Sequence, residues 1–281
     1  MMTSPNASPD KPVTIAVTSG KGGVGKTNVT VNLAIALARL RHRVVVIDGD
    51  FGLGSVDVLL GLTPAHHIGH VLAGERSLAD IVVEGPGGVR IVPASSGIRQ
   101  LTALGRMQRE QILGQIRHVA QGSDFLLIDT APGVSDTVLE TVRGADLALV
   151  VTSGEPTAIV DAYAMIKLLT VRHAEMDLGL LVNGADNERE AHLIYGQLDA
   201  ATRRFLRRTI HSFGHVVHDE ALRDAVLCQR AVVDLHPDAV SSHGFRALAM
   251  ELGRLSPRRC DLRPVGPGRA HALAPMLTGA P

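Results

Sequence analysis

The chain has 281 residues, with 28 Lys and Arg against 28 Asp and Glu, two cysteines and no tryptophan. The balanced charge excludes a global attraction to nucleic acid or acidic lipid, so any such contact must come from a local patch. Cys228 and Cys260 lie outside any C-x-x-C pattern, which excludes a cysteine zinc or iron–sulfur motif and fits a reducing cytosol. Without a signal peptide or an apolar run of about 20 residues, the sequence predicts a cytoplasmic protein.

Two polar, Pro-containing segments, residues 1–12 and 256–281, are predicted to be disordered tails around one domain, residues 13–255. Inside that domain, amphipathic segments separate short apolar runs at 13–19, 43–48, 89–93, 124–129, 146–152, 178–183 and 214–217. Such continuous runs suit strands that are covered on both faces. The sequence therefore predicts an α/β fold, a doubly wound and mostly parallel sheet with helices on both faces, which binds ligands at its carboxyl edge.

Three segments between these runs show apolar positions that we expect on helices. These positions are Val29, Leu33, Leu37 and Leu40; then Ile112, Ile116 and Val119; and, with less regular spacing, Leu193, Leu198 and Phe205. The third segment also carries a basic stretch, ATRRFLRR, whose arginines are expected on one side of its helix: Arg203, Arg204, Arg207 and Arg208. Such a stretch is typical of a solvated helix face, and a DNA-binding patch is the alternative.

The first strand leads into a glycine-rich stretch, GKGGVGKT at residues 20–27, that matches the phosphate-binding pattern G-x-x-x-x-G-K-[ST]. Glycines let the backbone N–H groups turn toward phosphate oxygens, and the helix that follows adds its positive end. In this pattern Lys26 reaches the β- and γ-phosphates, and the Thr27 hydroxyl takes a Mg²⁺ position. The predicted nucleotide-binding residues here are Gly20, Lys21, Gly22, Gly23, Val24, Gly25, Lys26, Thr27 and Asn28.

The early lysine, Lys21, is not explained by the loop pattern, because it has no obvious path to its own nucleotide's γ-phosphate. The stretch GKGGVGKT resembles the deviant phosphate loop of the MinD/ParA family of P-loop ATPases. In that family the early lysine reaches across a face-to-face homodimer to the partner's phosphates. The resemblance therefore implies an ATP-dependent dimer and a catalytic role for Lys21.

Asp48 and Asp129 end the second and fourth apolar runs, and Asp50 lies two residues beyond the second. Asp129 ends DFLLID, the Walker B pattern, whose carboxylate holds Mg²⁺ through water. The resemblance places Asp48 near the Mg²⁺ shell and makes Asp50 the catalytic residue that orients the attacking water. A carboxylate at a strand end beside the phosphate loop is able to do either task.

Two further residues match the family's base-binding positions. Asn183 ends LGLLVN and matches an asparagine whose amide reads adenine. Asp219 matches an acidic position in the loop over the base, although Val217 stands where the family usually has proline. The resemblance thus implies ATP and Mg²⁺ as ligands.

Within the family, DGDFGLGSVDVLLGL, GVRIVPASSG and SGEPTAIVDAYAMIKLL are most similar to the FlhG (FleN) group of flagellar-number regulators. This resemblance implies an ATP hydrolase with slow turnover and a protein partner, a flagellar GTPase or a transcription regulator. MinD-type division-site control and ParA-type DNA partitioning are the alternatives. The Pro-rich C-terminal tail offers no amphipathic membrane helix, so we expect a cytoplasmic protein without such an anchor, with peripheral or polar placement open.

Overall fold

The computed structural model describes residues 11–50, 54–94 and 106–256, and residues 1–10 and 257–281 of the two predicted tails lie outside them. Its strands are β1 (Val13–Thr18), β2 (Val44–Gly49), β3 (Val83–Glu84), β4 (Arg90–Val92), β5 (Phe125–Thr130), β6 (Leu147–Thr152), β7 (Asp177–Ala185) and β8 (His211–Val217). They form one sheet in the order β3-β4-β2-β5-β1-β6-β7-β8. All pairs are parallel except β3 with β4.

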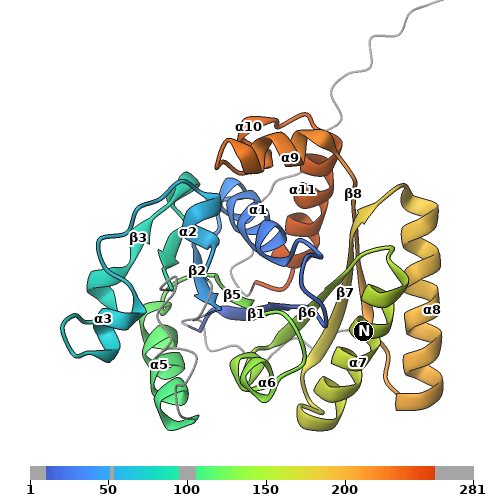
Figure 1. Ribbon diagram of the computed structural model, residues 1–281, viewed down its shortest axis with the longest axis horizontal. Coiled ribbons are helices and arrows are strands. Elements are labelled where there is room, and N and C mark those ends of the chain that lie inside the picture. The colour runs from blue at the N-terminus through green and yellow to red at the C-terminus, as the bar shows by residue number, and fades with distance from the viewer. Residues whose placement is uncertain (1–10, 51–53, 95–105, 257–281) are drawn as a thin grey trace, which may run out of the picture.

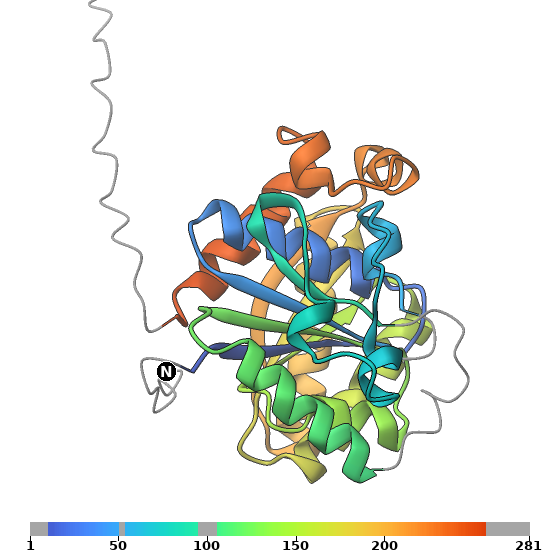
Figure 2. The same cartoon turned by 90° about the vertical axis from the view of Figure 1, so that its left-hand side faces the viewer.

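Helices cover both faces of this sheet (Figures 1 and 2). They are α1 (Lys26–Arg39), α2 (Val56–Leu59), α3 (Ile68–Leu72), α5 (Arg106–Val119), α6 (Asp136–Val142), α7 (Pro156–Arg172), α8 (Glu188–Leu206), α9 (Glu220–Leu227), α10 (Val232–Leu235) and α11 (Val240–Gly253). Short 3-10 turns occupy Ala79–Ile81 and Pro86–Gly88. The doubly wound, mostly parallel fold predicted from the apolar runs is confirmed, and each predicted run forms a strand.

The core divides by the alternation of side chains along the strands. Ile15 and Val17 of β1 face a cluster with α1, α10 and α11, whereas Ala16 between them faces α6, α7 and α8. Beside the second cluster, Ile112 and Ile116 of α5 pack on β2 and β5. This two-sided burial explains why the strands read as unbroken apolar runs.

The third predicted helix is confirmed as α8, but only one of its three expected apolar positions lies on the buried face. Leu198 is buried together with Ala191, Ile194 and Thr202, whereas Leu193 and Phe205 are 59% and 66% exposed. The expected row of arginines is also wrong, because α8 ends at Leu206 and Arg207 adopts a left-handed conformation with φ +52°. The other three arginines have different partners. Arg203 pairs with Asp199, Arg204 lies over the Phe205 ring, and Arg208 donates to the carbonyls of Ala174 and Met176.

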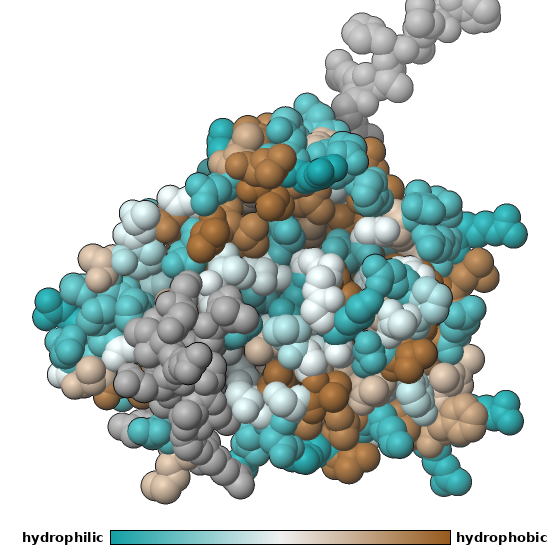
Figure 3. All heavy atoms as spheres, in the orientation of Figure 1, coloured by the Kyte–Doolittle hydropathy of each residue, from teal (hydrophilic) through white to brown (hydrophobic). Residues whose placement is uncertain are grey.

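No helix in the described part of the chain is both long and apolar enough to cross a bilayer. The surface in Figure 3 is mostly polar, with an apolar area over α9 and α10, where Leu227 is 76% exposed. The predicted absence of a C-terminal membrane helix concerns residues that lie outside the described ranges, and it stays a prediction.

Candidate nucleotide site

The glycine-rich loop connects β1 to α1 at the carboxyl edge of the sheet. Gly23 and Gly25 both have φ +84°, a conformation that side chains rarely adopt. A Cβ atom on Gly25 would lie 2.3 Å from Asn183 Nδ2, and one on Gly20 would lie 2.0 Å from the carbonyl oxygen of Asp161. The glycines therefore hold the loop in its turn and let β7 and α7 approach its backbone.

The loop encloses a hollow of about 310 Å³ in front of the first turn of α1. Asp50 and Pro132 close the hollow from the loops after β2 and β5. The predicted binding residues of the loop that line it are Lys21, Gly22, Gly23, Val24, Gly25, Lys26, Thr27 and Asn28. A hollow with a helix N-terminus at its base suits a phosphate chain.

Lys26, at the end of the loop, lies close to Asp129, at the end of β5. Lys26 is buried, and its Nζ lies 4.0 Å from Asp129 Oδ1. The hydroxyl of Thr30 donates to Asp129 at 3.0 Å, and the Thr27 hydroxyl is close enough to the same carboxylate to lower its pKa. Burial raises the pKa of Asp129, and the nearby Lys26 ammonium opposes that rise. A nearby cation would stabilise the ionised form of this buried carboxylate.

Asp48 lies beside Asp129, because the two residues are register partners on β2 and β5. Burial and the neighbouring Asp129 carboxylate raise the pKa of Asp48 to about 7. Both of its oxygens accept backbone N–H groups, Oδ1 from Asp50 at 3.1 Å and Oδ2 from Ser55 at 2.7 Å. Asp48 thus holds the backbone in place at Asp50 and at Ser55.

Lys21 points toward α7 of its own chain. Its Nζ donates to Glu155 Oε2 at 2.5 Å and to Thr157 Oγ1 at 2.9 Å. The pair is largely solvent-accessible, since the Lys21 and Glu155 side chains are 36% and 65% exposed. No local signal in the sequence identified Glu155 as a site residue, because it lies 134 positions away from Lys21.

Asn183 belongs to a second hollow of about 420 Å³ on the other side of the loop. Its Nδ2 donates to the Val24 carbonyl at 2.8 Å, so the side chain is oriented by the loop. Its Oδ1 is buried and has no hydrogen-bond partner among the described residues. A buried acceptor without a donor is costly, and a ligand amino group would satisfy it.

Asp219 is placed differently from the other predicted site residues. It caps α9, where Oδ1 accepts from the Ala221 N–H at 2.9 Å. Oδ2 accepts from the N–H and hydroxyl of Ser241, at 3.0 and 2.9 Å. Asp219 lines neither hollow, and its predicted contact with the base stays a prediction.

A buried strand, a glycine-rich loop and a helix, with a strand-end aspartate behind the loop lysine, define a P-loop nucleotide-binding protein. The chain belongs to the ParA (MinD/ParA) family, whose model, described as NUBPL iron-transfer P-loop NTPase, matches residues 12–252. The family membership predicted from GKGGVGKT is thereby confirmed.

Two curated relatives and one solved structure show the range of the similarity. The chain is 44% identical over 238 residues to the antiactivator FleN of Pseudomonas aeruginosa, covering 85% of each protein. It is 30% identical over 236 residues to the flagellum site-determining protein YlxH of Helicobacter pylori, covering 84% of this chain and 80% of that protein. The septum site-determining protein MinD of Pyrococcus horikoshii, solved with Mg-ADP, matches with a TM-score of 0.74 at 23% identity, covering 86% of this chain and 96% of that one.

Proposed function

We propose that the protein is an ATP-hydrolysing switch that dimerises with ATP and regulates the number or placement of flagella. One observation carries this proposal. Lys26, Asp129 and Asp50 converge on the phosphate loop of a chain that is 44% identical to the antiactivator FleN.

The residues present fit a nucleotide and Mg²⁺. The loop hollow offers backbone N–H groups and Lys26 to the phosphates. The Thr27 hydroxyl and the Asp129 carboxylate would hold the metal ion, with Asp48 behind them. The raised pKa values of Asp48 and Asp129 support this assignment, because two buried neighbouring carboxylates favour a cation. When bound there, Mg²⁺ would neutralise part of the phosphate charge.

We assign to Asp50 the role of orienting the water that attacks the terminal phosphate. This residue lines the hollow opposite the loop, and its backbone is fixed by the hydrogen bond to Asp48. In that position its carboxylate accepts a proton from the attacking water and orients its oxygen toward the terminal phosphate. The Asn183 Oδ1 accepts from the amino group of adenine, which accounts for its lack of a hydrogen-bond partner among the described residues.

We assign to Lys21 the role of contacting the phosphates bound by the second protomer of a dimer. In the single chain Lys21 rests on Glu155 and Thr157. The terminal phosphates of a second protomer carry more negative charge than one carboxylate, so they compete for the same ammonium when two chains meet face to face. ADP lacks the γ-phosphate and so presents less negative charge to the Lys21 ammonium of the other protomer. ATP therefore favours the dimer by its differential affinity for the closed state.

Slow turnover follows from the composition of the hollow. Among the residues that the structure describes, its lining includes two lysines but no arginine, and an arginine finger is the element that most accelerates related reactions. We therefore assign the protein a regulatory ATPase activity that responds to a protein partner in the cytoplasm or at the pole. The arginines at and after the end of α8 point to different partners and give no support to the DNA-partitioning alternative.

Two experiments test the proposal. In Pseudomonas aeruginosa cells that lack FleN, the chain is expected to restore normal flagellar number, whereas its Lys26→Ala variant is not. Failure of both proteins at equal expression would contradict the flagellar role. Salt-sensitive retention of the ATP form on DNA, measured at physiological ionic strength, would instead favour partitioning.

A further inference from the structure

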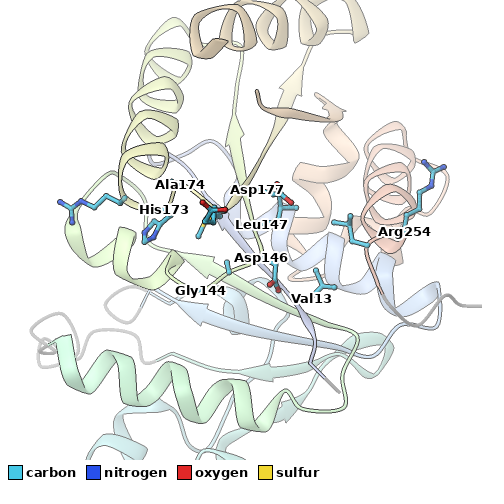
Figure 4. A pocket seen from close by; sticks show the side chains of 13 residues that line it. Val13, Gly144, Asp146, Leu147, His173, Ala174, Asp177 and Arg254 are labelled. Carbon is cyan, nitrogen blue, oxygen red and sulfur yellow. The ribbon is translucent and has the colours of Figure 1, made fainter. Parts of the chain in front are cut away.

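A second feature of the fold lies far from the nucleotide loop, at the amino ends of β1, β6 and β7. A hollow of about 680 Å³ opens there between the end of α7 and the end of α11 (Figure 4). Its size is within the range of hollows that bury a ligand or a short peptide segment. Nothing in the proposed ATPase cycle uses it.

The hollow has an apolar wall. Val13, Leu147 and Met176 lie at the starts of three neighbouring strands and contribute this surface. Leu255, which follows α11, completes the wall and is only partly buried. Val13, Leu147 and Met176 are only 4%, 2% and 6% exposed, so an apolar side chain that enters the hollow would mainly remove Leu255 from water.

Three acidic residues and two arginines line the hollow, and a further cation, Arg208, donates to the carbonyls of Ala174 and Met176 beside it. One of the three acids, Asp146, pairs with Lys11 at 3.3 Å. Arg172 and Arg254 line it, but each pairs with an acidic residue outside it, Asp136 at 2.8 Å and Glu251 at 2.6 Å. Glu175 and Asp177 line it as well, and across the described ranges neither forms an ion pair. The hollow therefore suits a ligand that carries both cations and apolar groups.

The chain itself supplies such a ligand. Arg254 and Leu255 form one wall, and the sequence continues from Ser256 into residues 257–281. The first seven of these residues, PRRCDLR, contain three arginines and one leucine against a single aspartate. An extended chain advances about 3.3–3.6 Å per residue, so Arg258 and Arg259 lie within about 7–11 Å of Ser256.

We propose that this hollow is the docking site of the chain's own C-terminal segment, residues 257–281. Arg258 and Arg259 pair with Glu175 and Asp177, and Leu262 covers the apolar wall. Exposed ion pairs are individually weak. The short covalent connection compensates, because it keeps the segment at a high effective concentration beside the hollow.

The native Cys260 permits a direct test in the full-length chain. In a Cys228→Ser background, Ala174→Cys places a thiol on the hollow, whereas Ala247→Cys places one on the exposed side of α11 as the matched control. Each protein is treated with a mild oxidant, and formation of the intramolecular disulfide with Cys260 is followed by mass spectrometry. Thermal unfolding checks that each variant is folded.

We expect the Ala174→Cys protein to cross-link about tenfold faster than the control, a ratio that corresponds to about 1.4 kcal/mol. Arg258→Glu with Arg259→Glu is expected to remove the difference, and adding Glu175→Arg with Asp177→Arg to restore it. Equal rates at the two positions, or no response to the charge reversals, would overturn the proposal. A disulfide between two chains whose rate rises with protein concentration would also overturn it, because another copy would then supply the segment.

Discussion

Replacing Glu155 with glutamine tests how the resting contact of Lys21 opposes dimerisation. If Lys21 must leave Glu155 to reach a partner's phosphates, then each ATP-bound dimer breaks two such contacts. The Lys21 Nζ and Glu155 Oε2 atoms are 2.5 Å apart, but both side chains are accessible to water. An ion pair of this kind contributes about 0.2–1 kcal/mol.

Two such contacts oppose the dimer by about 0.4–2 kcal/mol, if each follows the range for exposed pairs. At 1.4 kcal/mol for each factor of ten, Glu155→Gln should therefore tighten the ATP-dependent dimer by about 2- to 30-fold. Sedimentation equilibrium with ATP and Mg²⁺ measures the dimer dissociation constant directly. Glu188→Gln, an exposed carboxylate at the start of α8, is the matched control and should change it little.

The effect should also require Lys21. In a Lys21→Ala background, Glu155→Gln should leave the association unchanged, because no ammonium remains to be released. A Glu155→Gln protein whose ATP-dependent dimer is weaker than that of the parent would refute the reasoning, since Glu155 would then stabilise the dimer rather than oppose it.

Three further changes test other parts of the account. Asp50→Ala should keep ATP binding in a titration but lower the hydrolysis rate by at least about 100-fold, the lower end for loss of a general base; a normal rate would exclude Asp50 from the mechanism. Gly25→Ala should weaken ATP binding at least about tenfold more than Gly23→Ala, because both have φ +84° but only the Gly25 Cβ would meet Asn183; equal losses would mean that backbone conformation alone matters. Burial lowers the pKa of His42 below its ordinary value of 6.5, against the opposing Asp124 carboxylate. The unfolded chain therefore binds a proton at His42 more readily than the folded chain does. The contribution of His42 to stability is complete above pH 6.5 and falls as the pH drops. Between pH 7.5 and 5.5, the free energy of unfolding measured in urea should decrease less for His42→Gln than for the parent.

The central strands β1, β2, β5 and β6 could be predicted because each is buried on both faces and reads as one apolar run. β3 was missed, since two residues at the sheet edge carry no periodic signal. The buried face of α8 was misjudged for a different reason. It uses Ala191 and Thr202, whereas the larger Leu193 and Phe205 point to solvent, and residue type alone does not reveal that choice.

The site was predictable where chemistry lies in consecutive residues, as in the loop from Gly20 to Thr27 and in Asp129 at the end of β5. Contacts between distant segments were not. Asn183 donates to the Val24 carbonyl, and Lys21 donates to Glu155, because the fold brings these separate segments together. A local pattern fixes which groups are present, and the tertiary structure decides which partner each one takes.

The central claim is that Lys21 acts between two chains and not within one. Sedimentation of the parent protein and of Lys21→Ala, each with ATP and Mg²⁺ and again with ADP, tests this most directly, beside a nucleotide titration of both. We expect an ATP-dependent dimer for the parent, and a Lys21→Ala protein that binds ATP but stays monomeric. A Lys21→Ala protein that dimerises normally with ATP would contradict the central claim.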